Sequence, residues 1–140
     1  MTCGDTAANI PAPTTVAEPG LSPVAPVIDL VHLARQTAGD RDLETELLRL
    51  FEKQCQRATG QLRSGPKLTA AEKADLAHSI KGSAQAIGAV RVAQAAERFE
   101  NACARDDPGS SDGKELSALS GQLQEALAQA GATIVSWLTA

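Results

Sequence analysis

The sequence lacks tyrosine altogether, and its aromatic side chains are limited to Phe51, Phe99 and Trp137. Alanine, by contrast, occurs 26 times in the 140 residues. A core of alanine and leucine with so few aromatic rings suits closely packed helices and suits a β-sandwich poorly. A chain of this length supports one hydrophobic core and is too short for two. We therefore expect a single all-α domain.

Cationic residues and paired cysteines are also scarce. The 13 Lys and Arg residues against 17 Asp and Glu give a net charge of −4, which argues against a nucleic-acid partner because phosphates require a basic face. Cys3, Cys55 and Cys103 form neither a zinc-binding spacing nor an even disulfide framework, which predicts a reducing, cytoplasmic environment. Residues 1–20 contain no Lys or Arg, so they do not form a signal peptide, and no segment reaches the ~18–20 apolar residues of a membrane helix.

Five of the seven prolines lie in residues 1–27, which predicts a flexible tail there. From residue 28 onward, apolar residues recur at three- and four-residue spacing, as in amphipathic helices. We predict an up-down-up-down four-helix bundle over residues 28–140, with a short extra helix at its N-terminal end. Residues typical of helix N-termini are Asp40, the pair Thr69 and Glu72, and the pair Asp112 and Glu115, whereas Gly88 is typical of a helix end.

The apolar stripes predict which side chains face the core. For the second helix the predicted inner face consists of Leu43, Leu47, Leu50, Phe51, Gln54, Ala58 and Leu62. For the fourth it consists of Val92, Ala95, Ala96, Phe99 and Cys103. For the last it consists of Leu116, Leu119, Leu123, Leu127, Ala130, Ile134 and Trp137. Cys55, Cys103, Phe99 and Trp137 are thus interpreted as packing residues.

The third helix carries an unusual combination of side chains around His78. At about 100° per residue, His78 lies opposite the apolar face that contains Ile80 and Ile87. Lys81 follows one helical turn later, where its charge can act on an anion carried by the imidazole. Gly82 costs about 1 kcal/mol relative to alanine inside a helix, which favours a need for close approach. The pattern indicates an exposed imidazole beside a cation, on a surface cleared of bulk.

The remaining sequence restricts the chemistry of that imidazole. It offers no Ser or Cys poised for a catalytic triad and no glycine-rich phosphate loop, so we expect no ATP site and no autokinase activity. An unperturbed imidazole, with a pKa of about 6.5, is largely neutral at pH 7 and is a competent nucleophile toward an activated phosphoryl group. Asp106 and Asp107 are interpreted as a solvated turn, so no metal site is expected.

Residues 78–88, HSIKGSAQAIG, resemble the signature of histidine-containing phosphotransfer (HPt) domains, in which His, Lys and two Gly keep this spacing within a helix. The resemblance covers about residues 28–137 and includes the Gly-Asp start of the second helix, Phe51, and the AERFEN run at 96–101. It implies that His78 is phosphorylated through Nε2, that Lys81 stabilises the phosphoryl charge, and that Gly82 leaves room for a receiver domain. It also implies that Glu100 orients the imidazole through its other nitrogen.

The resemblance further implies a phosphorelay intermediate of two-component signalling. A receiver-domain aspartate would phosphorylate His78, and a response-regulator receiver would accept the group next. Residues expected to contact these partners are Ala71, Ala74 and Gln85, with Ser83 placed toward the packed side. Cofactors are expected to be absent, with Mg²⁺ belonging only to the receiver's acidic pocket.

Several alternatives accompany this reading. The chain could instead be a helical adaptor that binds a receiver-like partner through the same face without being phosphorylated, although that reading gives no reason for His78, Lys81 and Gly82 to coincide. His32 is interpreted as a surface histidine, because Gln36 stands where a second phosphosite would need glycine. A monomer is expected, and the Met1 start favours a stand-alone protein over an excised part of a hybrid kinase.

Overall fold

The computed structural model describes residues 26–64, 68–105 and 112–139, and every regular element within those ranges is an α-helix. The expected all-α class is confirmed for this part of the chain. In chain order the helices are α2 (Leu30–Thr37), α3 (Arg41–Arg63), α4 (Ala70–Ile87), α5 (Val90–Ala104) and α6 (Asp112–Thr139). None of these helices combines the length and the apolar character needed to cross a bilayer. Nearly all of the predicted tail and the predicted loop at 107–111 lie outside the described residues.

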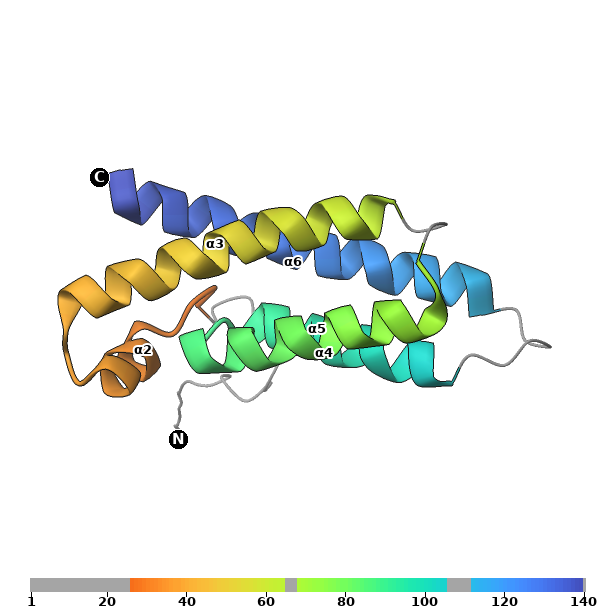
Figure 1. The fold of residues 1–140 in the computed structure, drawn as a ribbon, viewed down its shortest axis with the longest axis horizontal. Helices are drawn as coiled ribbons and strands as arrows, with labels where there is room; N and C mark the ends of the chain where they lie inside the picture. The colour runs from red at the N-terminus through yellow and green to blue at the C-terminus, as the bar shows by residue number, and fades with distance from the viewer. Residues whose placement is uncertain (1–25, 65–67, 106–111, 140) are drawn as a thin grey trace, which may run out of the picture.

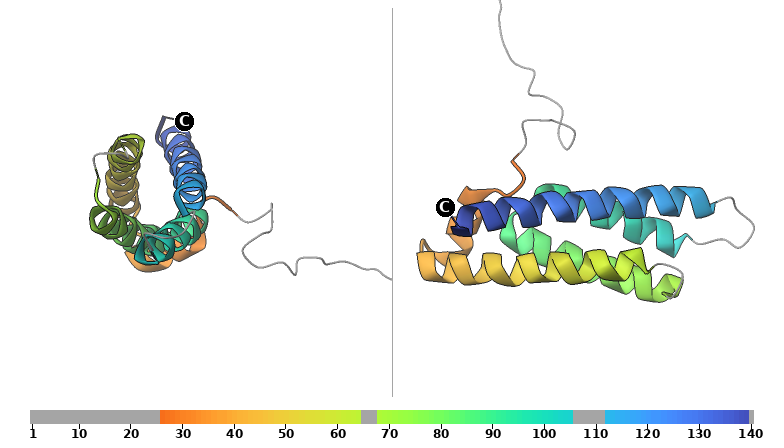
Figure 2. Two further views of the ribbon diagram at one scale, coloured as in Figure 1. Left: turned by 90° about the vertical axis from the view of Figure 1, so that its right-hand side faces the viewer. Right: turned by 90° about the horizontal axis from the view of Figure 1, so that it is seen from above.

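The longer helices lie side by side, and the short α2 lies against one end of them (Figure 1). Helix α3 packs against α4 and α6, and α5 packs against the same two helices. The view along the helix axes shows α3, α4, α5 and α6 at the corners of a quadrilateral (Figure 2). Successive long helices run in opposite directions (Figure 1). Each long helix therefore buries one stripe between two neighbours and leaves its outer side to solvent.

The helix boundaries follow the capping residues in the sequence. Asp40 accepts a hydrogen bond from the Leu43 backbone N–H at 3.1 Å and caps α3. Thr69 and Glu72 make both hydrogen bonds of a capping box at the start of α4. Gly88 ends α4 with a φ of 90°, which glycine adopts without steric cost. The predicted ends of α4 and the predicted start of α3 are thus confirmed.

The core consists of aliphatic side chains, alanines, two cysteines and both phenylalanines. The buried side chains of the long helices are Leu48, Phe51, Cys55, Ala58 and Leu62 in α3; Ala77, Ile80, Ala84 and Ile87 in α4; Val92, Ala95, Ala96, Phe99, Ala102 and Cys103 in α5; and Leu123, Leu127, Ala130 and Ile134 in α6. All five predicted inner residues of α5 are buried. The small alanine side chains allow the helices to approach closely without aromatic filling.

The predicted inner faces are wrong at three positions. Leu43 and Leu50 of α3 leave 43% and 52% of their surfaces exposed, and Trp137 near the end of α6 leaves 38% exposed. In α3, Leu48 and Cys55 face inward instead, because both lie within about 60° of Phe51 around the helix. Leu50 precedes Phe51 directly and is therefore turned about 100° away from it.

Helix α2 folds back onto the turn between α4 and α5. The Asp29 backbone N–H donates a hydrogen bond to the Gly88 carbonyl at 2.9 Å. A Cβ atom at Gly88 would lie 2.9 Å from the Asp29 carbonyl oxygen and 3.3 Å from Cδ2 of His32. The imidazole of His32 is half-buried there, and its Nε2 atom is inaccessible to solvent and has no hydrogen-bond partner among the described residues. The interpretation of His32 as a surface histidine is therefore wrong.

Candidate functional site

His78 projects from the outer side of α4, midway along the helix. Its side chain is 71% exposed, whereas Ile80 and Ala84 on the opposite side are fully buried. The helical phase of the sequence predicted this orientation. Because α4 is fixed by a capping box at one end and by Gly88 at the other, the imidazole stands on a rigid element. The imidazole of His78, a potential nucleophile, is thus accessible to incoming molecules.

Glu100 of α5 joins His78 and Lys81 into one cluster. Its Oε2 atom lies 3.0 Å from Nδ1 of His78, and its Oε1 atom lies 3.1 Å from Nζ of Lys81. The side chains of Lys81 and Glu100 are both largely covered, with 22% and 23% of their surfaces exposed. A carboxylate accepts from Nδ1–H, so this contact selects the tautomer whose proton is on Nδ1 and whose lone pair is on Nε2.

The surroundings of Glu100 hold it in its charged form. Partial burial by itself raises the pKa of the Glu100 carboxyl, but hydrogen bonds and positive charge from Lys81 and His78 outweigh that effect and lower it overall. A charged Glu100 is the better acceptor for both neighbours. Around neutral pH the charged carboxylate therefore contacts both the imidazole of His78 and the ammonium of Lys81.

Gly82 lies one turn beyond His78 and has empty space in front of it. A Cβ atom at this position would meet no heavy atom of the described chain within 4 Å, apart from its own helix backbone. Its φ is not in the left-handed region, so neither backbone strain nor internal packing requires glycine there. Gly60 and Gly121 are equally open within their helices, so Gly82 differs from them in lying one turn from His78.

The other predicted contact residues are spread around His78. Ala71 and Gln85 are exposed on α4, on either side of His78 along the helix. Ala74 is half-buried and packs against the core, so it contributes less outer surface than the sequence predicted. Ser83 is half-buried and lines a groove between α3 and α4. Their contacts with a partner remain predictions.

Both thiols in the described part of the chain are buried. Cys55 and Cys103 lie in the core, as predicted. Burial, with a smaller contribution from the charge of Glu52, raises the pKa of the Cys55 thiol to about 12, so it stays protonated near neutral pH. No three His, Cys, Asp or Glu side chains of the described residues gather to hold a metal ion. Cys3, Asp106 and Asp107 lie outside those residues.

A family model described as the Hpt domain matches residues 46–133, which is more than half of the chain and includes His78 and Glu100. The chain belongs to the Hpt domain family. Among the curated proteins, and among the solved structures, no match to this sequence is found. Membership of the Hpt family implies phosphotransfer in two-component phosphorelays, and Hpt domains interact with receiver domains of kinases and response regulators.

One contact in this Hpt domain is absent from the predictions made from its sequence. Lys81 was expected only beside the phosphoryl group, whereas in the structure its ammonium forms an ion pair with Glu100. Residues on neighbouring antiparallel helices are brought together by the register of the α4–α5 pair, which is not a local sequence property. The opposite charges of Lys81 and Glu100, each placed near the edge of its apolar stripe, were the available signal.

Proposed function

We propose that this Hpt domain is a phosphorelay intermediate that accepts a phosphoryl group from a receiver-domain aspartate onto Nε2 of His78 and passes it to a second receiver domain. The observation that carries the proposal is the hydrogen bond between Nδ1 of His78 and Glu100, on a ring that is 71% exposed. It leaves Nε2 as the ring nitrogen with a lone pair directed away from Glu100. Family membership supports the same chemistry.

The proposed transfer of the phosphoryl group needs neither a general base nor a cofactor on this chain. The Nε2 lone pair attacks the phosphorus of the aspartyl phosphate in line, an N–P bond forms, and the P–O bond to the aspartate breaks. The electron pair of that bond returns to the aspartate carboxylate. The proton on Nδ1 stays in place throughout, and the positive charge gained by the ring is stabilised by Glu100. The reverse sequence delivers the group to the next receiver.

The residues around His78 take separate parts in this proposal. Lys81 lies one helical turn from His78 and is placed to offset phosphoryl charge, and its ammonium forms an ion pair with Glu100. Gly82 leaves the surface low where a receiver would lie. Ala71, Ala74 and Gln85 would contact that receiver. The Mg²⁺ that such chemistry uses would belong to the receiver's acidic pocket, as the sequence predicted.

We also propose the bundle topology, the domain bounds, the oligomeric state and the cellular compartment of this chain. The reversal of direction between neighbouring helices supports an up-down-up-down four-helix bundle with α2 as an extra N-terminal helix. The unit would extend over residues 28–140, act as a monomer in the cytoplasm, and follow a tail at 1–27. The buried, free thiol of Cys55 supports the reducing compartment. In such a bundle the side chains of the His78 cluster come from α4 and α5.

The test is phosphotransfer from a receiver domain. Receiver domains of the source organism, phosphorylated with radiolabelled acetyl phosphate, are mixed with the wild-type chain, with His78→Gln and with Ser79→Ala. We expect acid-labile, alkali-stable label on the wild type and on Ser79→Ala, and none on His78→Gln. Receivers that bind the wild type but label neither it nor Ser79→Ala would establish the adaptor instead, and label that persists on His78→Gln would place the phosphoryl group elsewhere.

A further inference from the structure

The carboxylate of Glu100 has two opposite consequences for His78. By accepting a hydrogen bond from Nδ1–H it leaves the lone pair on Nε2, but its negative charge, 3.0 Å from Nδ1, also favours a second proton on the ring. A protonated Nε2 has no lone pair and cannot attack phosphorus. The nucleophile therefore needs the hydrogen bond to Glu100 without the full effect of the carboxylate charge.

Lys81 supplies the opposite charge that this requires. Its ammonium lies 3.1 Å from Oε1 of Glu100, which is the carboxylate oxygen that does not contact His78. Oε1 is closed to solvent, and Lys81 is its one ionic partner among the described residues. Lys81, rather than water, therefore balances this oxygen. With a neutral ring the charges of Lys81 and Glu100 cancel, whereas a protonated ring leaves the cluster with a net positive charge.

The ion pair between Lys81 and Glu100 is sheltered enough for its charges to act on the ring. Both side chains are largely covered, whereas both side chains of the ion pair between Arg105 and Glu115 are exposed. Solvent and salt screen covered charges less than exposed ones. The effect of Lys81 on its neighbours is therefore larger than that of an ion pair on the open surface.

Other charged side chains on α4 and α5 leave this balance to Lys81 and Glu100. Asp75 precedes His78 by three residues on α4, and Glu97 precedes Glu100 by three residues on α5. Both are exposed, and neither forms an ion pair with the ring in the described part of the chain. Their charges are screened by solvent, so their influence on the imidazole is weak.

From this geometry, and resting on the proposed function, we infer that Lys81 is a positioning residue for His78 before any phosphoryl group arrives. By pairing with Oε1 it offsets the charge of Glu100, so that Nδ1–H stays hydrogen-bonded while Nε2 keeps its lone pair at neutral pH. This task is separate from offsetting phosphoryl charge, because it is performed in the unphosphorylated chain and acts through Glu100. The effect of removing Lys81 should therefore depend on whether residue 100 carries a charge.

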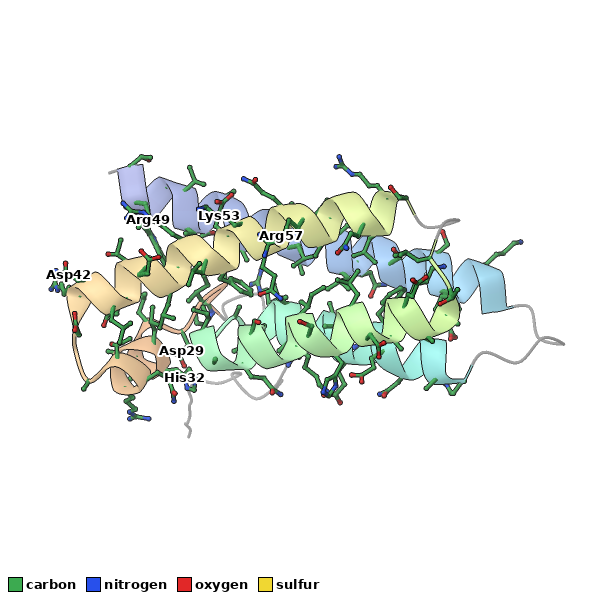
Figure 3. All side chains as sticks on the ribbon, viewed as in Figure 1. Asp29, His32, Asp42, Arg49, Lys53 and Arg57 are labelled. Carbon is green, nitrogen blue, oxygen red and sulfur yellow. The ribbon has the colours of Figure 1, made fainter. Side chains whose placement is uncertain are left out.

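An NMR titration of the full chain, labelled with ¹⁵N-histidine and recorded from pH 5 to pH 9 without a receiver, tests this inference. The variants are Lys81→Met, Lys81→Arg, Glu100→Gln and the combination of Lys81→Met with Glu100→Gln. Lys73→Met is the matched control, because it removes the same charge from α4 at a half-buried position about 140° around the helix from His78. His32, on α2 at one end of the bundle (Figure 3), is the internal reference for a folded chain, and His32→Gln assigns the two signals.

For Lys81→Met we expect the titration midpoint of His78 to rise by about half to one pH unit, because a neighbouring cation no longer opposes the protonated ring. Lys81→Arg keeps the charge, so it and Lys73→Met should shift the midpoint by less than about a fifth of a unit. In the Glu100→Gln background, Lys81→Met should raise the midpoint less than half as much, because no carboxylate then holds the ammonium beside the ring. The signal of His32 should stay unchanged throughout.

Three results would overturn the role assigned to Lys81. The first is a midpoint for Lys81→Met at or below that of the wild type, and the second is an equal rise for Lys73→Met. The third is an equal rise in the presence and absence of the Glu100 charge, since Lys81 would then act independently of Glu100. If the titrations agree with expectation but no receiver labels the wild type, the proposed function fails while the charge balance at His78 stands.

Discussion

His78 and His32 are the two histidines of the chain, and the structure places them in opposite surroundings. The ring of His78 is 71% exposed, and Glu100 holds its Nδ1 atom at 3.0 Å. The ring of His32 is half-buried against Gly88, and its Nε2 atom is shut off from solvent without a hydrogen-bond partner among the described residues. One imidazole is oriented and accessible, and the other fills space between α2 and the α4–α5 turn.

The comparison shows that the neighbours of a histidine decide whether it fits the role of phosphoryl carrier that we propose for His78. His78 combines three conditions that His32 lacks, which are an open approach, a carboxylate on the far ring nitrogen and a glycine one turn away. His32 has Arg35 at the spacing of Lys81, but Gln36 stands in the position that corresponds to Gly82. The four predictions below test these conditions, beginning with the largest expected effect.

Exchanging each histidine for glutamine tests the comparison most severely. We expect His78→Gln to abolish labelling by a phosphorylated receiver and His32→Gln to retain at least half of the wild-type rate. His32→Gln should instead lower the free energy of unfolding by about 1 kcal/mol, because a half-buried ring that packs against Gly88 is replaced. Transfer assays and urea denaturation of both variants provide the measurements. Loss of labelling in His32→Gln with a folded chain would contradict the assignment.

Removing the carboxylate tests the orientation of the ring. Glu100→Ala should slow transfer tenfold to a hundredfold, which corresponds to the roughly 1.5–3 kcal/mol of a hydrogen bond to a charged group. Glu100→Gln should recover most of that rate, because its amide oxygen still accepts from Nδ1–H. Single-turnover rates at saturating receiver separate this effect from binding. Equal rates for Glu100→Ala and the wild type would show that the contact does not position the imidazole.

Substitution of Gly82 is expected to have opposite effects on stability and on phosphotransfer. Gly82→Ala should raise the free energy of unfolding by about 0.5–1 kcal/mol, since alanine favours a helix and its methyl group meets open space. Transfer should nevertheless fall about tenfold, as expected when a methyl group intrudes into a packed interface at a cost of about 1–3 kcal/mol. Gly121→Ala on α6 is the control, because its site is equally open. It should gain the same stability with an unchanged transfer rate.

The smallest effect concerns the pH dependence of stability. The pKa of Glu100 is lower in the folded chain than in the unfolded chain, so the folded state favours the ionised carboxyl. Its contribution is fully present above the ordinary glutamate pKa of about 4.3 and is lost as the pH falls through the lowered value. Urea denaturation from pH 7 to pH 3 should therefore show the stability difference between the wild type and Glu100→Gln shrinking by up to about 1 kcal/mol. A stability difference that does not change with pH would show that the charge of Glu100 does not stabilise the folded chain.

Local sequence signals predicted most of the fold. Asp40, Thr69 with Glu72, and Gly88 mark helix ends because their effects act within one turn, and the exposure of His78 follows from the phase of a single helix. Leu50 and His32 could not be placed in this way. Leu50 is as apolar as its buried neighbours, and only the packing of α3 against α4 and α6 decides that it stays outside. The partial burial of His32 depends on α2 folding back onto Gly88, across more than fifty residues of sequence.

The most direct test of the central claim is to locate the phosphoryl group by mass spectrometry after transfer from a receiver at neutral pH. Trypsin cleaves after Lys73 and Lys81, so His78 is released in an eight-residue peptide that excludes His32. We predict a single phosphoryl group on that peptide, carried by His78, stable in alkali and lost in acid. A phosphoryl group on Ser79, on His32 or on any other peptide would contradict the account.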